Sequence, residues 1–476
     1  MAFTHVFADG AVIYAITGDG SLLWYRDELR DGTNGPNAEH GWAPNSGHQI
    51  GLGWNIQPEQ QLVGYAVPLS VAAGGDVEVM LSSLAPGLVT LQLHRLIERA
   101  DGSVGEPAGD PTTIQVAEQP VPALAWQEGC GWQATTTLII NPASSSGLYS
   151  ARVSAADGPA TDVVFVVRPA ADAAPAPVLV LANTNCWNAY NAWGGRSNYN
   201  VANTGITLSF HRPNPETAPD VRTADGWASN HLTAAEIWLL SWLEQQGHRY
   251  DVCSDADLHD GTVDLSGYRA FVMSTHPEYW SQQMAVRLGA YLDGGGHLLY
   301  LGGNAAFRTV EFSADGSAMT TGADESHWCA EAWSPDGPFP RTLLGVAYDI
   351  TADGNYPSRY GFIVDEAGHR FFTGTGLAKG EVFATAGRNG GGACGWEVDS
   401  ASAAFVGGPA APGVQLLAHG ELVTAAGYGG DIAYYDTSGG GFVLAIGSIT
   451  ATGGLGRDTR LDTLVINALT EAITPA

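Results

Sequence analysis

The sequence predicts a multi-domain protein in which a β-rich N-terminal part precedes an α/β domain built on an open parallel sheet. Three observations lead to this prediction. At 476 residues the chain is long enough for two or three domains. Short β-prone runs broken by Gly, Pro, Asp and Ser fill residues 1–170. From residue 177 onward, buried strands alternate with helical patterns, which is typical of a parallel α/β sheet.

Residues 1–56 predict a single small β unit. Strand-prone residues 12–16 and 22–25 flank a Gly-Asp-Gly turn, which indicates a hairpin. Trp and Gly recur at residues 41–42 and 49–54, so we expect four short strands, as in one blade of a β-propeller. The segment resembles a blade of the sugar-binding tachylectin-like family. A single blade cannot bury both of its faces, so we expect it to dock on its own chain or on a partner.

Residues 57–170 predict an immunoglobulin-like β-sandwich. Its strands are expected at residues 61–65, 76–81, 89–94, 147–153 and 163–167, and none of them carries a catalytic pattern. Residues 169–177 are rich in Ala and Pro, the composition of a linker. We therefore place the third, catalytic domain at residues 177–476.

The third domain is predicted from strands and helices in alternation. Strands are expected at residues 178–182, 250–253, 270–273, 297–301 and 441–446, with helices starting at Thr233, running through Met284, and spanning residues 461–473. Thr233 and Glu236 have the spacing of a capping box. Residues 310–440 are Gly- and Trp-rich, so we expect irregular insertions that line the site, with His327 and Trp328 among them.

The totals exclude several classes of protein. A net charge of −29 argues against nucleic acid or an anionic membrane surface as a partner. The five cysteines are far apart and form no CxxC motif, which argues against a disulfide framework and a structural zinc site. The N-terminus lacks the pattern of a signal peptide, and no apolar run approaches the roughly 20 residues of a membrane span. We therefore expect a cytoplasmic location.

A candidate site follows from topology. In a flavodoxin-like strand order the first and third strands are neighbours, and the segments that leave their carboxyl ends face one crevice. Tyr190 follows the first strand, and His276 and Glu278 follow the third. The fourth strand ends in Gly-Gly and Asn304. Pro277 restricts the backbone between His276 and Glu278, which suits a site that must be held still.

The chemistry of these side chains indicates a metal. A phenolate, an imidazole and a carboxylate form a hard, anionic ligand set that suits Fe(III). Three protein ligands leave positions open for water and a substrate carbonyl. Each residue also has a structural interpretation. Tyr190 could be a packed aromatic residue, His276 a loop cap, and Asn304 a turn residue. Glu397 could be a solvated acid.

Four stretches, at residues 189–196, 276–280, 302–304 and 390–399, resemble the large subunit of N,N-dimethylformamidase, an iron-dependent amidohydrolase. In that family a Tyr, a His and a Glu bind a mononuclear iron, which implies that Tyr190, His276 and Glu278 are the metal ligands. The resemblance also implies that Asn304 lies near the substrate and that Glu397 acts as a base.

Two alternatives stay open. Glutamine amidotransferases share the α/β architecture and place a nucleophilic Cys after a central strand, but the turn after Leu301 holds no Cys, and Cys394 has no recognisable partner pattern. A cysteine-nucleophile amidase is thus one alternative, and a carbohydrate-binding lectin-like protein with a non-catalytic α/β domain is the other. The GxGxxG motif of a dinucleotide site is absent from the first strand–helix turn.

These observations lead to the hypothesis of an Fe(III)-dependent hydrolase that cleaves a small N-substituted amide to a carboxylate and an amine through an activated water. Asn304 would orient the substrate or steady the oxyanion, and Glu397 would carry protons. The expected partners are the amide substrate, further copies of the chain in a homo-oligomer and, as the resemblance implies, a small subunit.

Overall fold

The structure is a computed structural model in which the chain divides into two compact units, residues 1–62 and 63–476. The described residues are 3–9, 12–17, 21–26, 49–51, 62–156, 158, 160–199, 205–219, 231–322, 340–348, 359–401, 409–421, 423–424 and 427–475. Each unit is considered by itself.

The first unit contains a four-stranded antiparallel sheet with the strands in chain order. Its strands are β1 (Phe3–Asp9), β2 (Val12–Thr17), β3 (Leu22–Arg26) and β4 (Gln49–Gly51). The predicted hairpin is confirmed as β2 paired with β3. The predicted Gly-Trp pairs at residues 41–42 and 53–54 lie outside the described residues, and the propeller-blade interpretation stays a prediction.

The second unit begins with two further sheets, and every strand predicted between residues 62 and 168 is confirmed. One sheet has the order β11 (Thr136–Ile139), β7 (Asp76–Ser83) and β5 (Leu62–Val67). The other has the order β10 (Thr112–Val116), β8 (Gly87–Glu98), β12 (Gly147–Ala155), β13 (Ala160–Arg168) and β6 (Ser70–Ala72), with β9 (Val104–Pro107) beside β8. Val77 and Val79 on β7, and Ala151 and Val153 on β12, are fully buried at alternate positions. That period of two shows one face of each strand turned to a core.

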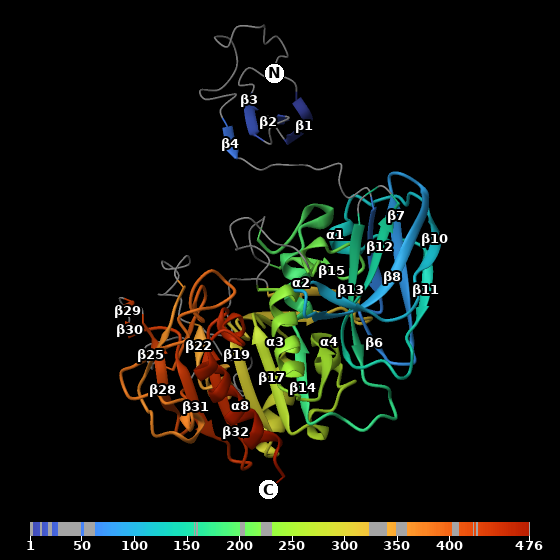
Figure 1. Cartoon of the computed structure of the whole chain (residues 1–476). Coiled ribbons are helices and arrows are strands. Elements are labelled where there is room, and N and C mark those ends of the chain that lie inside the picture. Colours follow the sequence, from blue (N-terminus) through green and yellow to red (C-terminus); the bar gives the residue numbers. More distant parts are fainter. Residues whose placement is uncertain are drawn as a thin grey trace. The chain divides into compact units, whose positions relative to one another are not determined.

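The α/β part is built on a nine-stranded mixed sheet, and Figure 1 shows its central strands side by side. The order starts with β16 (Tyr250–Ser254), β14 (Val178–Ala182), β17 (Ala270–Thr275), β19 (His297–Gly302) and β32 (Phe442–Gly447), all parallel. It continues antiparallel through β31 (Ile432–Asp436), β28 (Gln415–Gly420), β24 (Phe362–Val364) and β25 (Val382–Phe383). The first and third strands of this part, β14 and β17, are neighbours, as predicted.

Residues 310–440 differ from the prediction, because they are not simply irregular insertions. They contribute β31, β28, β24 and β25 to the sheet. They also contribute β21 (Ala318–Thr321), which forms a small sheet with β15 (Thr207–Ser209), β20 (Arg308–Phe312) and β18 (Tyr279–Trp280). Three short strand pairs complete the region: β22 (Ala347–Tyr348) with β27 (Asp399–Ser400), β23 (Arg359–Tyr360) with β26 (Cys394–Gly395), and β29 (Val423–Thr424) with β30 (Gly427–Tyr428). Scattered Gly and Trp residues hid these short strands, which lack an apolar run.

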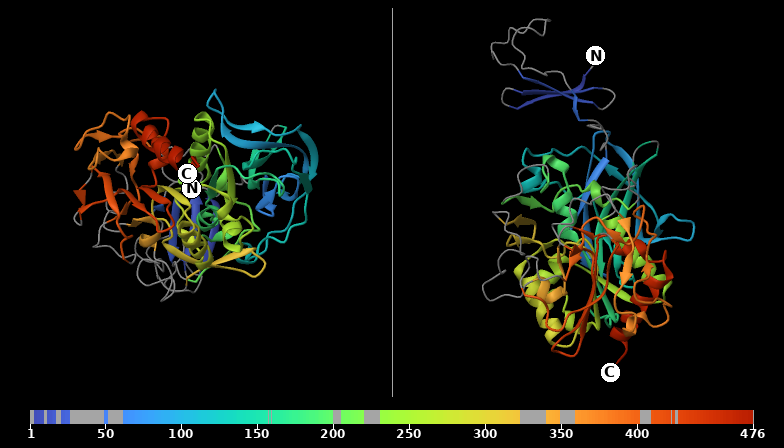
Figure 2. Two further views of the ribbon diagram at one scale, coloured as in Figure 1. Left: turned by 90° about the horizontal axis from the view of Figure 1, so that it is seen from below. Right: turned by 90° about the vertical axis from the view of Figure 1, so that its left-hand side faces the viewer.

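Helices cover both faces of the large sheet (Figure 2). On one face α2 (Thr184–Tyr190), α3 (Thr233–Gln245) and α8 (Thr459–Ile473) pack on Val180, Val272 and Leu299. On the other face, α4 (Asp255–Asp260) and α5 (Gln282–Asp293) pack on the alternate residues of the same strands, such as Phe271 and Leu298. Buried strands with apolar residues on both faces are what a covered parallel sheet requires. The remaining short helices are α1 (Ala125–Glu128), α6 (Pro340–Leu344), α7 (Ala451–Gly454) and the 3-10 turns Trp193–Gly195, Pro215–Thr217, Leu265–Gly267 and Arg370–Phe372.

The predicted capping box at Thr233 is wrong. Leu232 is the N-cap of α3, and no side chain caps the helix there. The Glu236 carboxylate turns away from the helix end and accepts hydrogen bonds from Asn183 Nδ2 (3.0 Å) and Trp187 Nε1 (3.1 Å). The hydrogen-bond donors Asn183, at the N-cap of α2, and Trp187, within α2, therefore outweigh the local capping motif.

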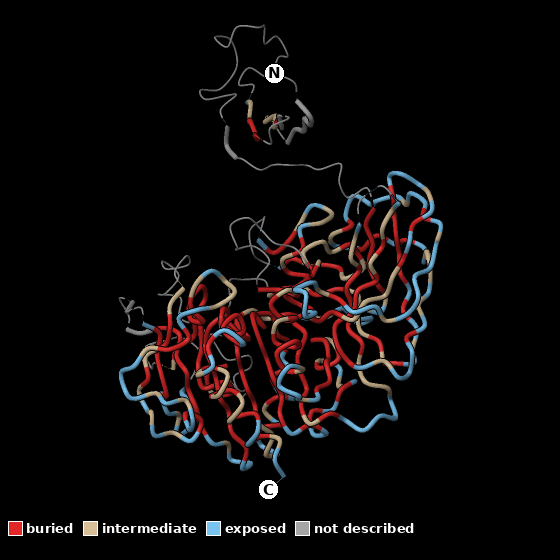
Figure 3. The backbone as a smooth tube through the Cα atoms, in the orientation of Figure 1, coloured by how far each residue is buried: buried red, intermediate tan, exposed pale blue. Residues whose placement is uncertain are grey.

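The parallel strands of the large sheet are buried along almost their whole length (Figure 3). None of the helices among the described residues combines the length and the apolar character needed to cross a membrane.

Candidate functional site

The site lies where β14 and β17 end, because parallel neighbours deliver their carboxyl ends to the same edge of the sheet. After β14 the chain turns directly into α2, which ends at Tyr190. β17 ends at Thr275, whose φ of 58° lies in the left-handed region. Asn183 holds this corner, because its Nδ2 donates to the Ser274 carbonyl (2.9 Å) and to Thr275 Oγ1 (2.8 Å). A strained residue fixed by buried hydrogen bonds is common at functional sites.

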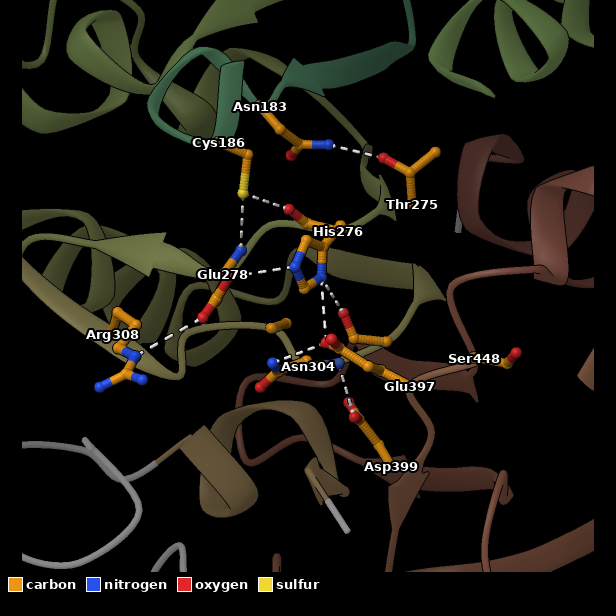
Figure 4. Close-up of polar contacts among 12 residues, drawn as sticks. Asn183, Cys186, Thr275, His276, Glu278, Asn304, Arg308, Glu397, Asp399 and Ser448 are labelled. Atoms are coloured by element: carbon orange, nitrogen blue, oxygen red, sulfur yellow. Dashed lines mark hydrogen bonds and ion pairs between the residues drawn. The ribbon is translucent and has the colours of Figure 1, made fainter. Parts of the chain in front are cut away.

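The three residues predicted to bind a metal meet at one point. Tyr190 Oη lies 3.1 Å from His276 Nε2, and Glu278 Oε2 lies 3.0 Å from the same nitrogen. The other ring nitrogen of His276, Nδ1, is 3.1 Å from the Gly303 carbonyl oxygen. A carbonyl only accepts, so Nδ1 carries a proton there and Nε2 faces Tyr190 and Glu278. Figure 4 shows the His276 ring between the side chains of Glu278 and Glu397.

The electrostatics of this cluster follow from burial and from a surplus of acids. Burial, together with the charges of Glu278 and Glu397, raises the pKa of the Tyr190 phenol well above its usual value. Burial opposes a charged His276, but Glu397 and Glu278 outweigh it and raise the pKa of its imidazole to about 9. Burial likewise opposes a charged Glu278, yet its bond to His276 holds the pKa of this carboxyl below its usual value. The site therefore favours positive charge beside its acids.

Three further residues contact Glu278 or its backbone, and the sequence analysis missed all of them. Tyr199 Oη donates to Glu278 Oε2 at 2.8 Å, and Arg308 Nε is 3.7 Å from Glu278 Oε1. Cys186 Sγ donates to the His276 carbonyl (2.6 Å) and accepts from the Glu278 amide (3.4 Å). Cys186 and Tyr190 are four residues apart on α2, a spacing that places both on one helix face. That spacing is the one signal that could have pointed to Cys186.

The Asn304 and Glu397 side chains also meet, across 93 residues of sequence. Asn304 Nδ2 donates to Glu397 Oε2 at 2.7 Å, and this oxygen is 3.6 Å from His276 Nδ1. Asp399 Oδ1 accepts from the backbone N–H of Asn304 (2.7 Å), and Asp399 Oδ2 accepts from the Tyr300 hydroxyl (2.7 Å). Asn304 has a positive φ of 56°, which Asn tolerates better than most residues. All five predicted site residues therefore belong to one cluster, in which Tyr190 is partly buried and the other four are buried.

His231 adds a ring to this cluster that the sequence analysis did not identify. Its ring centroid lies 4.4 Å from that of Tyr190, 5.4 Å from that of His276 and 4.8 Å from that of Trp396. It is only 3% exposed, and neither ring nitrogen has a hydrogen-bond partner in the described part of the chain. Burial, then the charge of His276, lowers its pKa well below the usual value.

Two donor sets could hold a cation here. Cys186 Sγ, a His276 nitrogen and a Glu278 oxygen all lie within 4.8 Å of one another, and Tyr190 Oη adds a fourth candidate donor. The Cys186 thiol, however, donates to a backbone carbonyl, and burial raises its pKa well above the usual value. Its proton is therefore engaged, which leaves Tyr190, His276 and Glu278 as the better donors.

The geometry does not favour a cysteine nucleophile among the described residues. Cys186 and Cys394 are both fully buried, and burial raises the pKa of each thiol well above its usual value. A nucleophilic Cys requires the opposite shift, toward the thiolate. Cys329, His327 and Trp328 lie outside the described residues.

The fold and the site together define an α/β protein with a buried Tyr-His-Glu centre at the carboxyl edge of its parallel strands. The chain belongs to the N,N-dimethylformamidase beta subunit-like family, whose C-terminal region matches residues 97–462. It is similar to the N,N-dimethylformamidase beta subunit of Alcaligenes sp, at 26% identity over 221 residues that cover 39% of this chain and 28% of that protein. It is also similar to the N,N-dimethylformamidase beta subunit of Paracoccus aminophilus, at 26% identity over 219 residues, or 38% of this chain and 28% of that protein. The matched regions thus span less than a third of these relatives.

Proposed function

We propose that this protein is an iron-dependent amidohydrolase that cleaves a small N-substituted amide to a carboxylate and an amine. One observation carries the proposal: Tyr190 Oη and Glu278 Oε2 lie 3.1 and 3.0 Å from the same nitrogen, His276 Nε2. The names of the two beta-subunit relatives support an amide as the substrate.

The donor set fits a mononuclear Fe(III). Donors about 2.1 Å from one ion at right angles are about 3.0 Å apart, which is the spacing found around His276 Nε2. Tyr190, Glu278 and Glu397 lie around His276 and would carry three negative charges when ionised, of which Arg308 offsets one, so a cation of high charge would suit the site. A ferric ion held there would polarise the substrate carbonyl and lower the pKa of water.

The residues around the ligands have separate tasks. The Tyr190 proton must leave before the oxygen can ligate, and the raised pKa of this phenol means that it leaves only when a cation compensates the charge. The Nδ1–H of His276 points at the Gly303 carbonyl, which orients Nε2 as the donor atom. Tyr199, which donates to Glu278, steadies the carboxylate.

Asn304 and Glu397 would handle substrate and protons. Glu397 accepts from Asn304 Nδ2 and is therefore oriented as a base that takes a proton from the attacking water and returns it to the leaving amine. Asn304 Nδ2 gives one of its two hydrogens to Glu397, and its buried Oδ1 has no partner among the described residues. The second N–H of Nδ2 and the acceptor Oδ1 would let Asn304 orient the substrate or the water, or steady the oxyanion.

The broader assembly follows from the same proposal. The order of the parallel strands, with β14 between β16 and β17, supports a flavodoxin-like sheet like that of glutamine amidotransferases. The beta-subunit names of the relatives support a multi-subunit complex. We accordingly propose a homo-oligomer that also binds a small subunit, with the tachylectin-like N-terminal unit as a docking element.

Metal analysis and absorption spectroscopy test the proposal. The purified protein should contain close to one iron per chain and show a visible phenolate-to-iron absorption band. Tyr190→Phe should abolish the band and most amide hydrolysis while the fold persists. Tyr149→Phe is the matched control, because this buried Tyr lies on β12 and donates to the Ser145 carbonyl.

Two outcomes would contradict the assignment. If Tyr190→Phe keeps both colour and turnover, Tyr190 is not a ligand. If the protein is colourless, contains no metal and binds sugars, the carbohydrate-binding alternative replaces the hydrolase.

A further inference from the structure

Amide hydrolysis places negative charge on the carbonyl oxygen of the substrate, and a hydrogen-bond donor there would add to the polarisation that a metal supplies. When water adds to the carbonyl carbon, the C=O electron pair moves onto that oxygen. The C–N bond then breaks and the departing nitrogen takes a proton, which leaves a carboxylate and an amine. Donors aimed at the developing oxyanion are usually the largest catalytic contribution in such reactions. Asn304 Nδ2 already gives one of its two hydrogens to Glu397.

His231 has the features of such a donor. It is 3% exposed, and both of its ring nitrogens lack a partner among the described residues. An imidazole carries at least one N–H in either protonation state, so His231 always has a donor to offer. A buried polar group without a partner is costly and calls for an explanation, such as a ligand that supplies the partner.

The position of His231 is also suitable. Its ring lies edge-on to the rings of Tyr190 and His276, at centroid distances of 4.4 and 5.4 Å. Trp396, the residue before Glu397, packs on the same ring at 4.8 Å. His231 is thus held by aromatic contacts beside both halves of the site, and these contacts use none of its polar atoms.

We propose that a ring N–H of His231 donates a hydrogen bond to the carbonyl oxygen of the bound amide, and to the oxyanion that forms from it. This inference rests on the proposed amidohydrolase function. His231 and Asn304 then divide the work: His231 donates to the substrate oxygen, and Asn304 Oδ1 accepts from the attacking water or from an amide N–H.

Three variants test this role. His231→Phe keeps an aromatic ring between Tyr190 and Trp396 but removes the donor, whereas His231→Gln restores an N–H. His248→Phe is the matched control, because His248 follows the opposite end of α3, about 20 Å along the helix axis from His231. For an oxyanion donor, His231→Phe should lower kcat by about 10²- to 10³-fold with little change in KM. His231→Gln should recover part of the loss, and His248→Phe should match the wild type.

Two measurements do not depend on turnover. The phenolate absorption should be unchanged in His231→Phe, because the ligand residues are intact. Binding of N,N-dimethylacetamide to the metal-free proteins, followed by ligand-observed NMR, should be about 3- to 10-fold weaker in His231→Phe than in the wild type.

The outcomes separate the two proposals. If wild-type protein hydrolyses amides and His231→Phe does so within about three-fold of it, the role of His231 is refuted and the function stands. Equal losses of activity in His231→Phe and His231→Gln, together with a lost absorption band, would show that His231 only supports the ligands. If the wild-type protein hydrolyses no amide but His231→Phe binds N,N-dimethylacetamide more weakly than the wild type, the substrate contact stands and the hydrolase proposal fails.

Discussion

Gly303→Ala should displace Glu397 and remove most of the activity. Gly303 follows β19 and packs directly against the backbone that carries Glu397. An added Cβ would lie 2.4 Å from the Glu397 carbonyl oxygen and 2.7 Å from the Ile449 nitrogen. These two atoms already form a 3.1 Å hydrogen bond with each other. Both contacts are with main-chain atoms, so no side chain can rotate to make room.

The magnitude follows from the distances. Contact with a carbon begins near 3.4 Å, so the backbone at Glu397 must retreat by about 1 Å. A shift of that size takes Glu397 Oε2, now 2.7 Å from Asn304 Nδ2, to the limit of hydrogen bonding. A misplacement of about 1 Å costs roughly 10²-fold in rate, and an overpacked core costs about 1–3 kcal/mol of stability.

The assay compares Gly303→Ala with Gly368→Ala, an exposed glycine where an added Cβ meets nothing within 4 Å. Urea unfolding gives the free energy of unfolding, and kcat/KM for one amide gives the catalytic effect. The free energy of unfolding of Gly368→Ala should equal that of the wild type or exceed it by up to about 1 kcal/mol, and its kcat/KM should be unchanged. The reasoning is refuted if Gly303→Ala retains wild-type turnover. It is also refuted if its effect adds fully to that of Glu397→Gln, since residues that act through one another are not additive.

Two further predictions concern residues around the ligands. Burial raises the pKa of the Glu236 carboxyl to about 8, against hydrogen bonds from Trp187 and Asn183 that lower it. The stability that Glu236 contributes is therefore complete below about pH 4.5 and is lost as the pH rises toward 8. Between pH 5 and 8.5, the free energy of unfolding of Glu236→Gln, measured by urea titration, should rise by up to a few kcal/mol relative to the wild type. A constant difference across this range would contradict the raised pKa. Cys186→Ala removes the hydrogen bonds to the His276 carbonyl and from the backbone N–H of Glu278. Iron affinity, measured by chelator competition, should therefore fall about 10-fold. Cys186→Ser keeps a donor, so its iron affinity should fall less. Equal affinity in Cys186→Ala and the wild type would show that the thiol does not position these ligands.

The sequence alone was enough to predict the elements that carry the site. The strands Val178–Ala182, Ala270–Thr275 and His297–Gly302 are short apolar runs with turns at both ends, and local composition is sufficient for such runs. Because parallel neighbours deliver their carboxyl ends to one edge, the positions of Tyr190, His276 and Asn304 after these strands predicted their convergence.

What only the tertiary structure decided concerns contacts between distant segments. Glu236 sits in a capping motif, yet it accepts from Asn183 and Trp187, because a buried carboxyl group gains more from two hydrogen-bond donors than from a helix end. The bond between Asn304 and Glu397 spans 93 residues, and no local pattern encodes it. His231 follows no recognisable motif, and its two unpartnered nitrogens become evident only once the rings of Tyr190 and Trp396 enclose it. Periodicity and turn chemistry act over a few residues, so the chain order of the elements could be derived from them. Partner choice for buried polar groups depends on the whole packed core, and it emerged only from the folded chain.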